Sequence, residues 1–553
     1  MHERHTNQFT KYTANLKFLQ KGGDIEKIWR SEQFENTLLH RALFFNAKIS
    51  GQKKDEVLLI IESIKKAAET GLCNDCQEKL SPQNKELTVE RRIKEFLNEQ
   101  DKNGYTALLS SVTRAYKFQD KYNEYKEIVS LLLEAGANPN IAAENFLYPL
   151  HVAASNLDVR MTDILCKKEV KIGVTDKDGY TPLHTAIINC KEKYDKTIEC
   201  LLKEGSNPNI ATKKCISPLQ TAVAFLNVKA VRILLEGGAD PNHTDKGDRS
   251  ALHFAINTML EHPNNYKEIR EIIELILNNK ILKIEINKKN YDGFTPLQSV
   301  IAGNTQVSER IEIVKKFLNQ QETDVNLQDQ NGNTPIISAI RSHDEVNGKK
   351  IVELLLKHEA CPNMQNYDGY GTLHACIIKE GDKTEIIELL LKFGAKVDQT
   401  TGNKSNTNTA LAMAVKHGHI KQTQCLLKHA ANPLKIIYAS IDGKHKYSVL
   451  DSANHLFRLF TKLADQFSIY EKQNIIGKDI QSLVVDTNGH PIHLLSARLS
   501  QMFEDQKSYD IYSVIQKVNN RLGIQRQIKD LIKRSIQQQK PGNVLNIPPQ
   551  ELE

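Results

Sequence analysis

Residues 176–209 read DKDGYTPLHTAIINCKEKYDKTIECLLKEGSNPN, and residues 210–242 read IATKKCISPLQTAVAFLNVKAVRILLEGGADPN. The second stretch repeats the first in order. Each has turn residues, a segment that opens with Thr or Ser before Pro, a second apolar segment, a Gly, and an Asn-Pro-Asn or Asp-Pro-Asn end. The fold therefore depends on a repeated unit of about this length.

Within the unit, the residue types predict a turn followed by two helices. Asp178-Gly179 is a turn dipeptide, because Gly supplies the positive φ that a tight turn needs. Thr181 is a good N-cap, and Pro182 suits the first helical position, where its missing N–H costs nothing. Farther along, Ile198, Leu201 and Leu202 recur at the spacing of one apolar helix face. Neither helix can bury that face alone, so the unit must stack on copies of itself.

The Thr181-Pro182-Leu183-His184 segment with Ala186 resembles the core of the ankyrin repeat, T-P-L-H-x-A, whose period is about 33 residues. Corresponding lead positions recur 33 to 45 residues apart along the chain. They are Thr106, Tyr148, Thr181, Ser217, Ser250, Thr295, Thr334, Gly371 and Thr409. The resemblance covers roughly residues 36–433, well past the three repeats that stability requires.

The resemblance implies an all-α ankyrin-repeat α-solenoid with helical N- and C-terminal caps. We expect the chain to divide into a helical cap (1–35), a first repeat-like unit with an insertion (36–100), the regular array (101–433), a helical region with degenerate repeats (434–540) and a flexible tail (541–553). The residues beyond 33 per repeat fall between the two helices, and we expect extended helix ends or protruding loops there.

Composition limits the class of protein. The 553 residues carry a formal net charge of +7, too small an excess to argue for nucleic acid. The nine cysteines are scattered and odd in number, which is typical of reduced thiols in a cytoplasmic compartment. The N-terminus lacks the apolar segment of a secretory signal, and no apolar run is long enough for a membrane span. We therefore expect a cytoplasmic protein, with any export into a host cell occurring without a cleaved signal.

The sequence gives little support for a metal site or a catalytic site. Histidines occupy one motif position in separate repeats, and the family resemblance implies that they hydrogen-bond the turns. They are His40, His151, His184, His253 and His374. Cys73 and Cys76 form a lone pair without the further ligands that zinc needs. No catalytic motif is present, so we expect a protein that is not an enzyme and that uses no cofactor or metal.

The residue just before each lead position carries the binding hypothesis. In the family these residues project from the hairpin tips beside the concave face. Aromatic and Arg side chains, which are enriched at binding hot spots, stand at several of them. The expected partner-binding residues are Tyr105, Tyr180, Arg249, Phe294 and Tyr370. The alternative is that each ring packs on a neighbouring hairpin.

The predicted function is non-catalytic protein–protein interaction on the concave face, by a monomer that binds one partner protein and no nucleic acid. The Asn/Lys/Ile-rich repeats resemble those of ankyrin-repeat effectors secreted by intracellular bacteria, which implies a eukaryotic host protein as partner. One alternative is an effector enzyme, a transferase or hydrolase with its site in 72–100 or 434–553. A weaker one is a peripheral membrane scaffold that uses the basic helix expected at 509–539.

Overall fold

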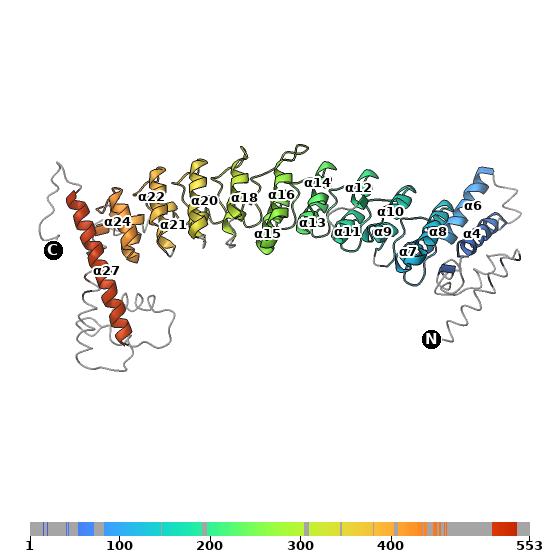
Figure 1. Ribbon diagram of the computed structural model, residues 1–553, viewed down its shortest axis with the longest axis horizontal. Helices are drawn as coiled ribbons and strands as arrows, with labels where there is room; N and C mark the ends of the chain where they lie inside the picture. Colours follow the sequence, from blue (N-terminus) through green and yellow to red (C-terminus); the bar gives the residue numbers. More distant parts are fainter. Residues whose placement is uncertain are drawn as a thin grey trace. The chain divides into compact units, whose positions relative to one another are not determined.

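The computed structural model describes residues 53–70, 82–144, 146–190, 196–303, 309–342, 345–379, 381–402, 408–434, 436–439, 446–450 and 511–538, with a few single residues outside these ranges. The expected cap at 1–35, the tail at 541–553, the Cys73/Cys76 pair and most of the degenerate repeats lie outside them. The chain divides into two units, Met1–Tyr291 and Asp292–Glu553. Figure 1 shows the paired helices of both units.

Unit 1 is a stack of helix pairs. Its first helices pack side by side and are α7 (Ala107–Lys117), α9 (Pro149–Ser155), α11 (Pro182–Asn189), α13 (Pro218–Ala224) and α15 (Ala251–Glu261). Its second helices form the other layer and are α8 (Tyr122–Glu134), α10 (Val159–Cys166), α12 (Lys196–Lys203), α14 (Val228–Glu236) and α16 (Tyr266–Leu277). At the N-terminal end, α4 (Lys53–Thr70) packs on α8 and on α6 (Pro82–Leu97).

Unit 2 continues the pattern. The first helices are α17 (Pro296–Ala302), α19 (Pro335–Arg341), α21 (Thr372–Ile378) and α23 (Ala410–His417). The second helices are α18 (Arg310–Leu318), α20 (Glu345–Lys357), α22 (Thr384–Lys392) and α24 (Ile420–Lys428). The long helix α27 (Ile511–Gln538) packs on α24 and closes this stack. The repeat solenoid expected from the sequence is therefore confirmed.

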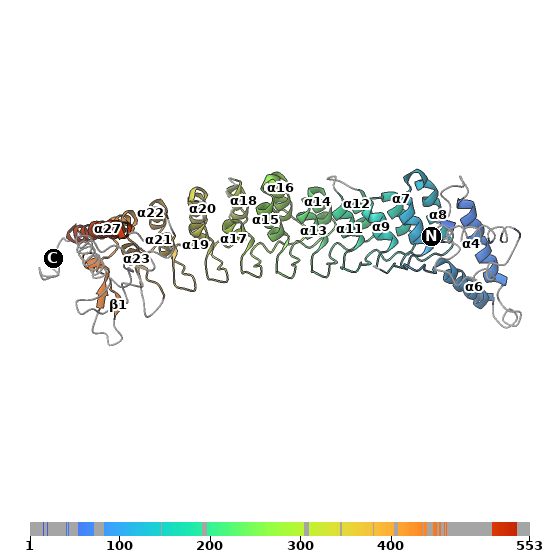
Figure 2. The same cartoon turned by 90° about the horizontal axis from the view of Figure 1, so that it is seen from below.

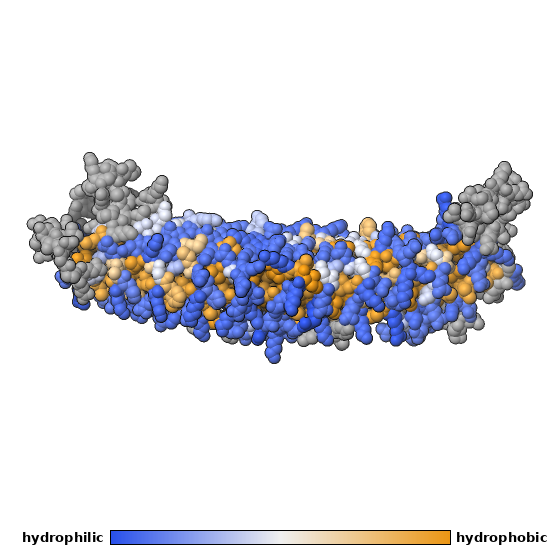
Figure 3. Space-filling view, turned by 90° about the horizontal axis from the view of Figure 1, so that it is seen from above, coloured by the Kyte–Doolittle hydropathy of each residue, from blue (hydrophilic) through white to orange (hydrophobic). Residues whose placement is uncertain are grey.

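Each unit keeps its core between the two helix layers. Leu183 and Ala186 of α11, and Ile198 and Leu201 of α12, are essentially inaccessible to solvent. The small Ala186 lets α11 pack closely on its neighbours α9 and α13. The turns that join successive repeats run along one side of each stack (Figure 2). On the face shown in Figure 3, hydrophilic residues cover most of either unit and hydrophobic residues show between them.

The link between the two helices of a repeat depends on its length. In short repeats a single residue in the left-handed region reverses the chain, at Leu157 (φ 56°), Leu226 (φ 56°) and Gly418 (φ 76°). In two longer repeats the helices extend, and a 3₁₀ turn joins them: η1 (Gln119–Lys121) and η2 (Pro263–Asn265). The added residues there are extended helix ends, one of the two forms expected.

One segment of the C-terminal region departs from the expected helices. Strands β1 (Ile436–Ala439) and β2 (Lys446–Ser448) pair antiparallel. Both strands contain Tyr, and β1 begins with two isoleucines, residue types that favour strands over helices. The sequence between them contains Asp442-Gly443, a dipeptide typical of hairpins, which is the signal that the sequence analysis missed.

Candidate functional site: the hairpin and first-helix face

A reciprocal hydrogen-bond pair locks the start of α11, α13, α15 and α17. At α11, the N–H of Thr181 donates to Nδ1 of His184 (3.2 Å), and the His184 N–H donates to Oγ1 of Thr181 (3.4 Å). Because Nδ1 accepts, the ring proton lies on Nε2, which donates to the Ile216 carbonyl of the next repeat (3.2 Å). One side chain therefore caps its own helix and holds the neighbouring hairpin.

The bond from a histidine Nε2 to a carbonyl of the following repeat recurs elsewhere in the chain. The Nε2 atoms of His40, His151 and His374 bond the carbonyls of Tyr105, Tyr180 and Asn408, at 2.6, 2.9 and 3.1 Å. The expectation that these histidines hold turns is confirmed for these repeats. Among the described residues, no group of three or more His, Cys, Asp or Glu side chains could hold a metal ion.

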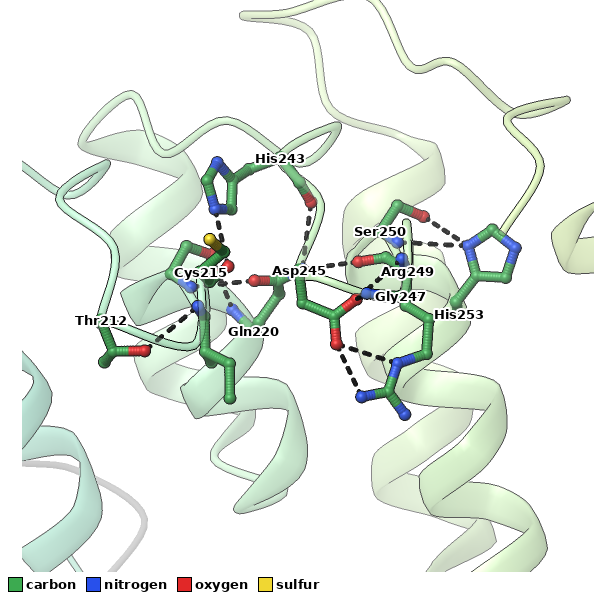
Figure 4. A network of polar contacts seen from close by, with 11 residues as sticks. Thr212, Cys215, Gln220, His243, Asp245, Gly247, Arg249, Ser250 and His253 are labelled. Atoms are coloured by element: carbon green, nitrogen blue, oxygen red, sulfur yellow. Dashed lines mark hydrogen bonds and ion pairs between the residues drawn. The ribbon is translucent and has the colours of Figure 1, made fainter. Parts of the chain in front are cut away.

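Glutamine performs the same task in two repeats. The Ser217 N–H donates to Oε1 of Gln220 (2.8 Å), and Nε2 of Gln220 donates to the carbonyls of His243 (3.1 Å) and Arg249 (2.7 Å) (Figure 4). Gln298 repeats this pattern with the Leu327 and Asn333 carbonyls. A glutamine amide can replace imidazole here because it also offers one acceptor and a donor at its far end.

Burial keeps the capping histidines neutral. Desolvation lowers the pKa of His184 to about 4, although the bond to the Ile216 carbonyl opposes the shift. Desolvation likewise lowers the pKa of His40, His151 and His374. At His184 and His374 the geometry needs a neutral ring, because Nδ1 accepts the N–H of the N-cap residue. These rings therefore serve the scaffold and do not act as acids or bases at neutral pH.

The five residues expected to bind a partner all stand directly before a helix cap and are half-buried. The Tyr180 ring lies edge-on to His184, with centroids 5.7 Å apart, and the Tyr370 ring lies edge-on to His374 at 6.2 Å. The structure does not gather the five into one cluster. Tyr105, Tyr180 and Arg249 belong to separate repeats of unit 1, whereas Phe294 and Tyr370 belong to separate repeats of unit 2.

Arg249 is held in place by its own hairpin. Its Nε and Nη2 atoms donate to Oδ2 of Asp245 (3.0 and 2.6 Å), and its guanidinium lies 4.9 Å from the Phe254 ring centre (Figure 4). Burial alone would raise the pKa of Asp245, but the hydrogen bonds from the Arg249 side chain and from the Arg249 and Gly247 N–H groups outweigh it and lower this pKa. Arg249 therefore stabilises the hairpin in addition to any contact with a partner.

The most exposed aromatic residues were missed by the sequence analysis. Tyr291 and Tyr367 keep 72% and 73% of their surface exposed, each at a hairpin tip before Asp-Gly. Their exposure could have been predicted, because a side chain in the middle of a tight turn points away from the packed helices. The residue nearer the helix folds back on the capping side chain instead.

A hollow of about 730 Å³ in unit 2 contains one of the expected residues. Three successive first helices, α19, α21 and α23, form it together with the hairpin side chain of Tyr370. Its lining combines apolar and basic side chains, including Ile337, Ile378, Met413, Arg341, Lys379 and Lys416. We call this hollow the α19–α23 groove.

A second hollow, of about 670 Å³ in unit 1, is lined mainly by polar side chains, and its central polar groups hydrogen-bond one another. The hydroxyl groups of Tyr116 and Tyr122 both donate to Oδ2 of Asp158, at 3.1 and 2.5 Å. The other oxygen of this carboxylate accepts the Met161 N–H and caps α10. Burial, with the adjacent carboxylate, raises the pKa of both tyrosines, so they stay protonated. This arrangement joins an extended repeat to its neighbour.

The described cysteines form no disulfide and offer no activated thiol. Burial raises the pKa of Cys166 to about 12 and of Cys425 to about 11. A buried thiol with a raised pKa is a poor nucleophile at neutral pH. Separately, none of the helices described is both long and apolar enough to cross a bilayer.

Comparison with known proteins identifies the class. The family model for ankyrin repeats in three copies matches residues 115–212, 188–269, 261–366 and 305–401, which together span just over half of the chain. The chain belongs to the ankyrin repeat family. Ankyrin repeats indicate a scaffold for protein–protein interaction.

Individual relatives match over parts of their length. The B-cell lymphoma 3 protein homolog of Mus musculus is 28% identical over 235 residues, covering 41% of this chain and 48% of that protein. An ankyrin repeat protein of Fowlpox virus is 32% identical over 121 residues (22% and 16%), and one of Acanthamoeba polyphaga mimivirus is 26% identical over 243 residues (40% and 29%). The chain therefore spans about half or less of the relatives it matches.

Proposed function

We propose that this protein is a non-catalytic scaffold that holds a partner protein on the face formed by its hairpins and first helices. The observation that carries the proposal is the α19–α23 groove, where one large aliphatic side chain stays exposed beside buried apolar ones. Ile378 of α21 keeps 49% of its surface exposed in this hollow. A large aliphatic side chain left exposed in a concavity is typical of a binding surface.

The rigidity of this face supports the same proposal. His374 ties the start of α21 to the Asn408 carbonyl of the next repeat, so the walls of the groove are fixed before a partner arrives. A pre-formed surface loses little conformational entropy on binding. We propose that Tyr370 contacts the partner in this groove, and that Tyr105, Tyr180, Arg249 and Phe294 contact it at the other hairpins.

The test compares two apolar-to-acidic substitutions in the full chain. Ile378→Asp places a charge in the groove, whereas Phe393→Asp places one directly after α22, a second helix, at a residue that is 37% exposed. We expect Ile378→Asp to abolish affinity capture of a partner from a eukaryotic lysate and Phe393→Asp to leave it intact, with similar melting curves for both. Equal capture by the two variants would reject the groove as the partner site.

From the resemblance to secreted effectors we also propose a host protein as partner and delivery as an effector. The scattered cysteines support action in the cytoplasm, and we propose a monomeric state. The relatives reported above come from an animal and from viruses. A bacterial origin therefore receives no support from them.

The two alternatives to this scaffold are an effector enzyme and a peripheral membrane scaffold. Residues 72–81, and most of 434–553, where an enzyme site was considered, lie outside the described residues. The membrane alternative is weakened by α27, because its apolar residues Ile528 and Ile532 are fully buried and the helix packs on α24. An amphipathic helix needs an open apolar face to enter a membrane surface.

A further inference from the structure

Basic side chains recur at one structural position around the α19–α23 groove. Arg341 is the last residue of α19, Lys379 directly follows α21, and Lys416 is in the last turn of α23. Three successive repeats thus each place a cation at the same end of the groove. Asp368 is the one acidic side chain in its lining. The groove therefore carries an excess of positive charge beside the exposed Ile378.

The surroundings of His417 are also positively charged. Partial burial lowers the pKa of this imidazole, and the adjacent His419 and the charges of Lys416 and of Arg521 of α27 lower it further. The ring is therefore neutral at pH 7 and offers hydrogen bonds without charge. Among the described residues, Arg341 and Lys416 form no ion pair with an acidic side chain. Their charges remain available to a ligand.

We propose that the α19–α23 groove binds an acidic segment of the partner, in which carboxylate side chains flank an apolar one. This inference rests on the proposed function and names the chemistry of its partner. Carboxylates would pair with Arg341, which can bind them through two parallel hydrogen bonds, and with Lys416. The apolar side chain would cover Ile378. A nucleic acid fits less well, because its sugar-phosphate backbone has no apolar group to place on Ile378.

The experiment selects ligands without assuming their sequence. A phage-displayed library of random peptides is panned on the full chain, and the selected peptides are measured by fluorescence anisotropy. We expect them to be enriched in Asp and Glu around Leu, Ile or Phe. Replacing their acidic residues by Gln should weaken binding about tenfold or more, and higher salt should weaken it too. Single-stranded RNA serves as a competitor.

Matched charge reversals locate the site. Arg341→Glu with Lys416→Glu should weaken the selected peptides about tenfold or more. Lys392→Glu with Lys428→Glu should change affinity less than about twofold. The control lysines also lie in last turns, those of α22 and α24, so both pairs remove the same interaction with a helix end.

The outcomes separate this inference from the proposed function. Peptides that need Ile378 but show no acidic enrichment, or equal losses in the two double variants, overturn the acidic ligand and leave the scaffold intact. Displacement by RNA as strong as by acidic peptide also overturns it. If the library yields no peptide that depends on Ile378, the groove itself is rejected and both proposals fail.

Discussion

The capping residue of the first helix is the smallest feature that determines this fold. In α11 it is His184, and in α13 it is Gln220, and both side chains bond their own N-cap residue and a carbonyl of the following repeat. The sequence predicted that histidines here hold turns. It could not show which carbonyl each would find, because that atom comes from another repeat. Nor could it show that Tyr180 would fold onto His184.

The His184→Gln substitution tests the pH dependence of this connection. In the folded protein the pKa of His184 is lowered to about 4, from about 6.5 in an unfolded chain. Between these values the unfolded state binds the proton and the folded state does not, so acidification from pH 7 to pH 4 costs stability, on the order of 3 kcal/mol. We expect the Gln variant to match the wild type at pH 7.5 and to retain more protection of α11 at pH 5, measured by hydrogen exchange.

A surface substitution provides the control for that experiment. His262→Gln removes an exposed histidine and should leave the pH profile of α11 unchanged. The idea would be wrong if the wild type and His184→Gln lost the same protection between pH 7.5 and pH 5.

The helices were largely predictable, and the structure departs from expectation where a segment meets a distant partner. A Thr or Ser before Pro marks the start of α11, α13 and α17, as expected from capping preferences. The docking of α27 was not predictable, because it depends on atoms more than a hundred residues away. Its Gln525 donates to the Val415 carbonyl (3.3 Å), and its Arg521 to the Lys416 carbonyl (3.4 Å). These bonds satisfy the C-terminal end of α23.

Substitution by alanine should change stability in opposite directions at two glycines, one where α23 meets α27 and one within α27. Gly418 ends α23 with φ +76°, and a Cβ there would lie 2.6 Å from an Arg521 nitrogen. We expect Gly418→Ala to destabilise the end of unit 2 by about 1–2 kcal/mol from the left-handed backbone alone. Gly523 lies within α27, where a Cβ would meet nothing within 4 Å. Gly523→Ala should stabilise by about 0.5–1 kcal/mol. Thermal unfolding checks both, and equal shifts would refute the proposed packing.

Within each unit, the described repeats pack on their neighbours along the stack. Within unit 2, α20 packs between α18 and α22, and α22 packs between α20 and α24. The sequence predicted this arrangement from recurrence alone. The division of the chain between Tyr291 and Asp292 was not predicted, although it falls in the longest interval between lead positions, Ser250 to Thr295. The groove also escaped prediction, since it requires side chains from three repeats at once.

Truncation before residue 509 tests how far stability spreads along the chain. Removing α27 removes its contact with α24 and the burial of its Ile528 and Ile532, a loss of about 1.5–3 kcal/mol for each such side chain. In a linear array such a loss stays local. We expect hydrogen exchange to accelerate in α23 and α24 and to remain unchanged in α9 to α14. Acceleration throughout unit 1 would show that the stack unfolds as a single cooperative body.

The 3₁₀ turns of the two extended repeats have a practical consequence. Bonds from His and Gln fasten several hairpins to the following repeat, so an insertion on that side would have to preserve them. At Gln119–Lys121 and Pro263–Asn265 the chain already accommodates additional residues without disturbing the packing of α7, α8, α15 or α16. These two positions are therefore suitable places to splice in an epitope tag or a fluorescent protein for tracking this molecule in cells.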